Sequence, residues 1–271
     1  MRNILALARI TFMEGIRSRS VFGIALFSFF VLGLNITVAG FFMRDIGKVT
    51  VDMNISALNF AGILLLFFVG LNLITKDIEK RTIQIVLSKP ISRLEYVLGK
   101  YFGIISFTFV SFLVLVLVST FTIFFLKKFY SEYFFDYLWA NYYISCFFIY
   151  VKFSLLASVI ILFSSVATSS FVSLIFSLSV FIVGLTIEDV VFYLKSEIAI
   201  QEKVVSAGLE RFISFISYIC PNFSAFDFGM EASHGLMIEP ERMLFVLLYA
   251  VVYISILLFL SAYIFSRREF Y

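Results

Sequence analysis

Residues 76–100 read KDIEKRTIQIVLSKPISRLEYVLGK and form the long charged interruption in the first half of a strongly apolar sequence. This stretch holds six basic and three acidic side chains. One apolar segment ends directly before it, and a longer one begins directly after it. A loop between two membrane spans that is rich in Lys and Arg is typical of the cytoplasmic side. The stretch therefore predicts two spans joined by a cytoplasmic loop.

The loop itself predicts two helices separated by a bend. Pro90 stops the first helix, because proline lacks the backbone N–H and restricts the residue before it. Ser92 with Glu95 three residues later is a capping box, which predicts that a second helix starts there. The apolar residues of the first half recur at helical spacing; they are Ile78, Ile83, Val86 and Leu87. On physical grounds, this loop is either a connector facing lipid headgroups or a docking surface for a cytoplasmic partner.

The composition excludes a soluble domain. The chain has 271 residues, of which 62% are hydrophobic and only 14% charged, and its mean hydropathy is +1.04. A soluble fold has no way to bury so much apolar surface. We expect an all-α polytopic membrane protein, a single transmembrane domain over 1–271 with six transmembrane helices. The expected spans, each long enough to cross a bilayer, are 21–42, 55–75, 101–126, 142–166, 171–187 and 243–265.

Two further helices are expected outside the spans. Residues 3–20 place Ile4, Ala8, Phe12 and Ile16 at four-residue spacing among arginines, which predicts an interfacial amphipathic helix. No small-residue cleavage site follows, so this segment does not resemble a signal peptide. Residues 204–220 are apolar but short and contain a charged pair, so an outer-surface or re-entrant helix fits them better than a seventh span.

The charge distribution gives the expected orientation. Segments 1–20, 76–100 and 266–271 together hold 12 basic and 5 acidic residues. Segments 43–54, 127–141 and 188–242 hold 8 basic and 13 acidic residues. The side richer in Lys and Arg is normally cytoplasmic. We therefore expect both termini and the loop 76–100 in the cytoplasm, and the loop 188–242 outside.

The same loop resembles the first cytoplasmic loop of type-2 ABC exporter permeases. The resemblance lies in ExxTI at 79–83, LSxPISR at 87–93 and YxxGK at 96–100. It implies a coupling helix that docks in a groove of a separate ATPase subunit, with an elbow helix before the first span. The residues that it implies for the ATPase contact are Glu79, Arg81, Thr82, Leu87, Ser88, Pro90, Ile91 and Arg93.

The C-terminal part resembles one branch of that family, the permeases linked to maturation of multicopper enzymes such as nitrous-oxide reductase. The motifs are CPNF at 220–223, FD at 226–227, EASHG at 231–235 and FSRREF at 265–270. The resemblance implies two permease copies, as a homodimer or heterodimer, above two ABC ATPase subunits. It implies a bacterial or archaeal plasma membrane, with lipids as further partners and no nucleic acid. Members of the branch are diverse, so it names no substrate.

The sequence carries no catalytic motif. It contains no GxxxxGK[ST] for nucleotide binding and no HExxH. We expect a transport subunit without a cofactor, with ATP and Mg on the partner ATPase. Cys220, Met230, His234 and Met237 are ligand types that Cu(I) favours, but their spacing matches no defined site, and ordinary packing is the expectation. Cys146 and Cys220 are not expected to form a disulfide.

Lys152 is the one charged residue inside an expected span. It lies past the midplane of the segment 142–166, toward the outer side. Its side chain either extends outward to the headgroups or lies at a subunit interface or on a substrate path. Three functions stay open at this stage: an exporter permease driven by a separate ATPase, a non-transporting anchor or sensor for an ATPase, and a membrane-embedded enzyme.

Overall fold

The computed structural model describes residues 2–39, 41, 45–79, 91–134, 137–194 and 207–267. Within these ranges the regular structure is helical, which confirms the all-α expectation. The long helices are α1 (Arg2–Ile16), α2 (Arg19–Ala39), α3 (Ile46–Leu65), α6 (Arg93–Phe129), α7 (Trp139–Val166), α8 (Ser170–Leu194), α10 (Ala207–Ile219) and α12 (Pro240–Arg267). The shorter elements are the π-helix η1 (Leu66–Gly70), α4 (Leu71–Glu79), the 3-10 turns η2 (Ser131–Tyr133) and η3 (Ser224–Phe226), and α11 (Gly229–His234).

Among these residues, five helical segments are long and apolar enough to cross a membrane, or six if one bent pair is a single span. The five are Ile46–Asp77, Arg93–Phe129, Trp139–Val166, Ser170–Leu194 and Pro240–Arg267. The bent pair is Arg2–Ile16 with Val21–Asn35, whose axes differ by 56°. The expected six crossings are thus at the upper end of this range, and the axis of α1 does not continue that of α2.

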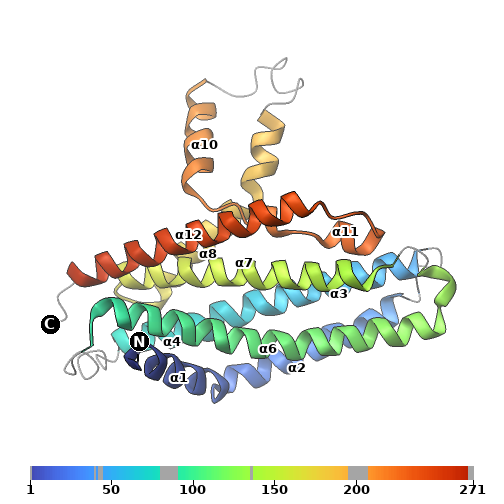
Figure 1. The fold of residues 1–271 in the computed structure, drawn as a ribbon, viewed down its shortest axis with the longest axis horizontal. Helices are drawn as coiled ribbons and strands as arrows, with labels where there is room; N and C mark the ends of the chain where they lie inside the picture. The colour runs from blue at the N-terminus through green and yellow to red at the C-terminus, as the bar shows by residue number, and fades with distance from the viewer. Residues whose placement is uncertain are drawn as a thin grey trace.

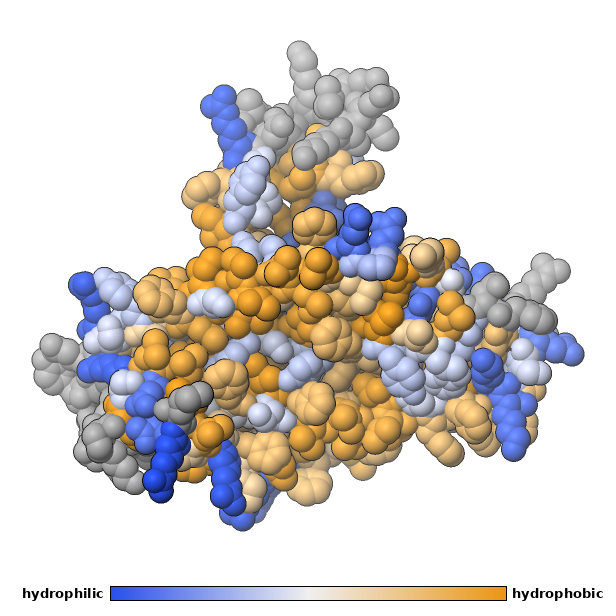
Figure 2. Space-filling view, viewed as in Figure 1, coloured by the Kyte–Doolittle hydropathy of each residue, from blue (hydrophilic) through white to orange (hydrophobic). Residues whose placement is uncertain are grey.

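The long helices of the bundle lie side by side, and different helix ends meet at its two ends (Figure 1). The start of α1, the end of α4, the start of α6 and the end of α12 lie at one end. The start of α3, the end of α6 and α11 lie at the other end. Apolar residues cover most of the bundle's length, with hydrophilic residues toward both ends (Figure 2). This distribution is what a membrane-spanning bundle requires.

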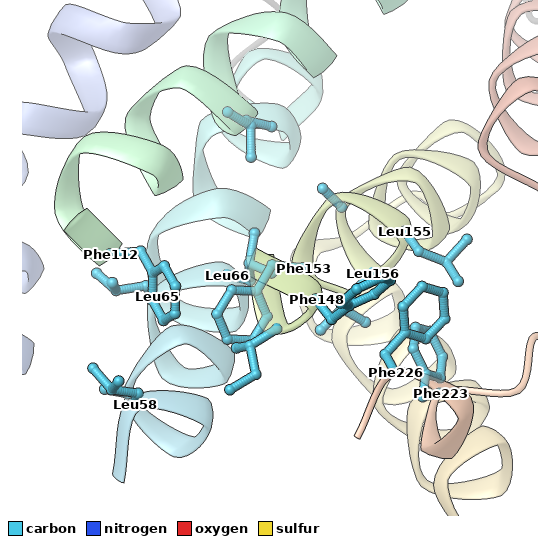
Figure 3. Packing of buried hydrophobic residues seen from close by; sticks show 14 of the residues in the cluster. Leu58, Leu65, Leu66, Phe112, Phe148, Phe153, Leu155, Leu156, Phe223 and Phe226 are labelled. Atoms are coloured by element: carbon cyan, nitrogen blue, oxygen red, sulfur yellow. The ribbon is translucent and has the colours of Figure 1, made fainter. Parts of the chain in front are cut away.

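Helix α7 forms the centre of the core (Figure 3). Phe148, Phe153, Leu155 and Leu156 of α7 are all at most 1% exposed. Phe153 packs so closely on α3 that a Cβ at Gly62 would lie 2.0 Å from the ring. The other labelled core residues are Leu58, Leu65, Leu66, Phe112, Phe223 and Phe226. Because α7 is apolar on nearly every side, it is buried by its neighbours rather than facing lipid along one stripe.

Helix α1 packs against α6 through residues that lie beside its expected apolar row. Its buried residues are Leu7, Thr11 and Gly15, whereas Ile16 is exposed. Ile4, Ala8 and Phe12, the rest of the expected apolar row, are half-buried. Glycines on α6 admit the row of Leu7 and Thr11.

Two expected span boundaries also differ from the helices. Residues 46–54, expected in an outer loop, form the start of α3. Some polar residues there are buried: Asn54 donates to the Thr50 carbonyl at 2.8 Å and accepts from Ser119 Oγ at 3.0 Å. Ser119 in turn accepts from the Tyr142 hydroxyl at 2.7 Å. Hydropathy penalises these polar side chains, but hydrogen bonds between helices let Asn54 and Ser119 stay inside the bundle.

The second difference is in α8, which continues to Leu194 rather than ending near 187. Its last part and α10 form a hairpin that rises from the side of the bundle (Figure 1). Residues 207–219 are helical, as expected for the apolar stretch 204–220, and α10 packs against α8. The hairpin exposes large apolar side chains, among them Phe192, Phe212, Phe215 and Tyr218.

The segment after α10 closes the bundle at the α11 end. Phe223, Phe226 and Phe228 are at most 1% exposed, and the Phe223 amide donates to the Gly184 carbonyl at 2.8 Å. A Cβ at Gly184 would lie 2.2 Å from the Pro221 carbonyl oxygen, so only glycine allows this approach. Within the expected outer loop, the segment from Pro221 to Ser233 is therefore packed against the core.

Candidate functional site

Most of the residues expected to contact an ATPase lie outside the described residues. They are Arg81, Thr82, Leu87, Ser88 and Pro90, and the first of the two expected helices lies with them. Glu79 is the last residue of α4. Ile91 is half-buried against the core, and Arg93 is the first residue of α6. The structure therefore shows how the two ends of the segment 80–90 are held.

The start of α6 has the capping box that the sequence predicts. Ser92 Oγ accepts from the Glu95 amide at 3.1 Å, and a Glu95 carboxylate oxygen accepts from the Ser92 amide at 3.0 Å. Asn3 of α1 donates to the same Glu95 carboxylate at 3.3 Å. This cap fixes where α6 begins and attaches that point to α1.

Arg93 and Tyr96 join the start of α6 to the end of α12. Arg93 donates a guanidinium hydrogen bond to the Phe265 carbonyl at 2.6 Å. The Tyr96 ring stacks on the Phe265 ring, with centroids 5.3 Å apart and planes 9° apart. The last helical carbonyls of α12 would otherwise lack partners within their own helix. A guanidinium at that position also suits the negative end of the helix dipole.

A buried ion pair joins α4 to α6. Lys100 Nζ lies 2.6 Å from an Asp77 carboxylate oxygen and donates to the Leu73 carbonyl at 2.8 Å. The Tyr96 hydroxyl donates to the same Asp77 carboxylate at 3.0 Å. The Lys100 side chain is only 5% exposed. Because each charge has further hydrogen-bonding partners, the pair is tolerated in a low-dielectric setting.

An exposed ion pair joins α4 to α1, since Lys76 Nζ lies 2.5 Å from a Glu14 carboxylate oxygen. Together these contacts tie α1, α4, α6 and α12 around the two ends of the segment 80–90. We call this set the loop clamp; its members are Asn3, Glu14, Lys76, Asp77, Ser92, Arg93, Glu95, Tyr96, Lys100 and Phe265. Sequence reasoning placed Lys100 with the loop's basic residues and missed its burial.

Glycines on α6 bring α1 close to the loop clamp. A Cβ at Gly99 would lie 2.6 Å from Leu7 Cβ, and one at Gly103 would lie 2.5 Å from Thr11 Cβ. Gly99 and Gly103 have the GxxxG spacing that allows close helix contact in membranes. This spacing is visible in the sequence and is the signal that would have predicted the contact.

Lys152 lies in the part of the bundle toward α11. Its residue is 2% exposed, and it lines a cavity between α3, α7 and α11 of about 600 Å³. The cavity contains other charged side chains.

The described residues contain no group of three or more His, Cys, Asp or Glu side chains placed to hold a metal ion. Met230 and His234 line the Lys152 cavity, and His234 Nδ1 lies 3.2 Å from the Met230 carbonyl oxygen. Cys146 and Cys220 are both free thiols. Burial raises the pKa of the Cys220 thiol, so it stays protonated at neutral pH.

These features define a helical multi-span membrane subunit whose sequence has no nucleotide-binding loop. The chain belongs to the ABC-2 family of transporter proteins, whose family model matches residues 5–270. It is accordingly a permease component of an ABC exporter, and nucleotide binding and hydrolysis belong to a separate ATPase subunit. No curated protein matches the chain.

Proposed function

We propose that residues 76–100 couple this permease to its ATPase. The observation that supports this role is the loop clamp, which attaches both ends of the segment 80–90 to four helices. A displacement at the segment would therefore reach α1, α4, α6 and α12 together. A mechanical linkage needs such stiffness, because a flexible connector would absorb the displacement.

The residues divide into two groups in this proposal. The first group forms the docking surface for the ATPase; its members are Glu79, Arg81, Thr82, Leu87, Ser88, Pro90 and Ile91. Arg93 acts within the chain by holding the start of α6 to the Phe265 carbonyl, so it positions the loop. An apolar anchor such as Leu87 and a charged partner such as Glu79 would supply affinity and register, respectively.

The proposed assembly has two permease copies and two ABC ATPase subunits in a bacterial or archaeal plasma membrane. The excess of Lys and Arg supports a cytoplasmic position for both termini and the loop clamp. The resemblance of 220–235 to the maturation permeases of multicopper enzymes favours a role in that branch of the family. The cargo is not implied by either argument.

Co-purification with the ATPase tests the coupling role. We expect Leu87→Ala to weaken ATPase binding by about 1–2 kcal/mol if the side chain is a buried anchor. Glu79→Lys should lower ATPase stimulation or abolish binding while the chain still inserts. Glu132→Lys is the matched control, because it reverses one exposed charge at the opposite end of the bundle.

If Leu87→Ala and Glu79→Lys bind and stimulate the ATPase as wild type does, the loop is a connector and the proposal fails.

A flux measurement in vesicles distinguishes a transporting permease from an anchor or sensor. Stimulated ATP hydrolysis without ATP-dependent movement of any cargo would favour the anchor.

A further inference from the structure

A polar cavity opens at the α11 end of the bundle, far along α7 from the loop clamp. Its volume is about 600 Å³, within the range of small-molecule sites. The walls come from the start of α3, the middle of α7, and the segment from Asp227 to α11. Its charged or titratable lining residues are Asp45, Lys48, Asp52, Lys152, Asp227 and His234.

Lys152 is the buried charge of this cavity. Its residue is 2% exposed, and it forms no hydrogen bond or ion pair with any residue that the structure describes. The buried Lys100 differs, because its ammonium group pairs with Asp77 and donates to the Leu73 carbonyl. An ammonium group has three donors and is costly to bury without acceptors. The Asp227 carboxylate acts on this ammonium through space. Lys152 therefore presents a cationic group without a direct hydrogen-bond partner to whatever enters the cavity.

The carboxylates have a different position. Asp45, Asp52 and Asp227 are exposed residues that line the same cavity, together with the half-buried Lys48, whereas Lys152 is buried. One Asp227 carboxylate oxygen accepts from the Gly229 amide at 2.8 Å, which fixes that side chain at the wall. The cavity thus has a cation at its buried side and carboxylates at its exposed side.

This polarity selects against simple ions. The two lysines and three aspartates sum to one negative charge, so a multiply charged anion would be repelled at the exposed side. A simple cation would leave Lys152 without an acceptor. A molecule with an anionic group at one end and an ammonium at the other satisfies both sides at once.

We propose that this cavity binds a small zwitterion, with its anionic group toward Lys152 and its ammonium toward Asp45, Asp52 and Asp227. Amino acids and short peptides carry this arrangement, and so does the phosphoethanolamine headgroup of a lipid. The site would give the permease a binding step at the face opposite the loop clamp. The binding itself does not depend on the coupling role proposed above.

Binding is measured by calorimetry on the purified full-length chain in nanodiscs of phosphatidylcholine, without ATPase. The probes are triglycine and O-phosphoethanolamine, which are both zwitterions, with N-acetyl-triglycine as the anion and triglycinamide as the cation. We expect at least one zwitterion to bind, and triglycine to bind about tenfold or more tightly than either capped form. Which zwitterion binds more tightly distinguishes a peptide-type ligand from a lipid headgroup.

Variants assign the charges. Lys152→Met keeps the length of the side chain and should weaken zwitterion binding about tenfold or more. Asp227→Asn should weaken binding of the zwitterion while leaving the weak binding of N-acetyl-triglycine unchanged or stronger. Lys128→Met is the matched control, since Lys128 is an exposed lysine near the end of α6 that does not line the cavity.

The proposal is overturned if neither zwitterion binds the wild-type chain at millimolar concentration. It is equally overturned if Lys152→Met binds the zwitterion as wild type does, or if N-acetyl-triglycine or triglycinamide binds as tightly as the tighter-binding zwitterion. Co-purification with the ATPase is run on the same preparations. Retained co-purification with absent binding would reject the cavity site and leave the coupling role intact.

Discussion

The residue Lys100 shows how a charge becomes part of the core of this protein. Its ammonium group pairs with Asp77, and the Tyr96 hydroxyl supports the same carboxylate. We predict that Lys100→Met destabilises the chain by about 3–5 kcal/mol, because it leaves the Asp77 charge partly buried without its counter-ion. The free energy of unfolding, measured by SDS titration in mixed micelles, checks this value.

The control for Lys100 is Lys76→Met, which removes the exposed pair with Glu14 and should cost less than about 1 kcal/mol. The double variant Lys100→Met with Asp77→Asn should recover part of the lost stability, since no unpaired charge is left. Equal losses in Lys100→Met and Lys76→Met would contradict the buried pair.

Sequence reasoning at the residue scale succeeded where the signal is local. Ser92 and Glu95 form their capping box within three residues, so the sequence alone predicts it. Lys100 and Lys152 needed partners from elsewhere in the chain. Asp77 is 23 positions from Lys100, and the cavity at Lys152 combines α3, α7 and α11. No pattern near either lysine specifies those neighbours.

At the scale of elements, the contact between α1 and α6 depends on two glycines. We predict that Gly103→Val separates the helices and costs about 1–3 kcal/mol, because its Cβ would overlap Thr11. The same unfolding measurement gives the energy, and faster proteolysis within α1 would show the loss of packing. Gly23→Val is the matched control, as nothing lies within 4 Å of the Cβ position at Gly23.

If Gly23→Val and Gly103→Val behave alike, the effect comes from backbone or β-branching and not from helix contact. The element scale also explains which residues of α1 contact α6. Hydrophobic spacing within 3–20 gives an apolar row through Ile4 and Phe12, but α6 offers its close-contact surface to the row through Leu7 and Thr11. Tertiary packing overrides an amphipathic pattern when small residues allow a closer approach.

The boundaries of α3 were misjudged for a related reason. Hydropathy treats Asn54 as a mark of a loop, whereas the folded bundle pairs it with Ser119 and the Thr50 carbonyl. A span whose polar residues are paired across helices can be longer than its apolar stretch. The existence of these helices was predictable from the apolar segments, but their ends were set by partners on α6 and α7.

For the whole molecule, the fold places two kinds of chemistry at opposite ends of one bundle. The loop clamp connects α1, α4, α6 and α12 at one end, and the Lys152 cavity lies between α3, α7 and α11 at the other (Figure 1). Helix α6 runs from Arg93 in the clamp to Phe129 as one continuous helix. In the coupling role proposed above, α6 would carry a displacement at the clamp along the bundle.

This arrangement predicts the sidedness of the protein in the membrane. Ser266 at the end of α12 and Ser131 in η2 are exposed and lie near opposite ends of the bundle. In a chain with Cys146 and Cys220 replaced by serine, a membrane-impermeant maleimide added to intact cells should label Ser131→Cys and not Ser266→Cys. Opening the cells should make Ser266→Cys reactive, because the excess of Lys and Arg predicts a cytoplasmic position for that end. Labelling of both positions from the outside would show that they share a face of the membrane and would remove the basis for placing the loop clamp beside an ATPase.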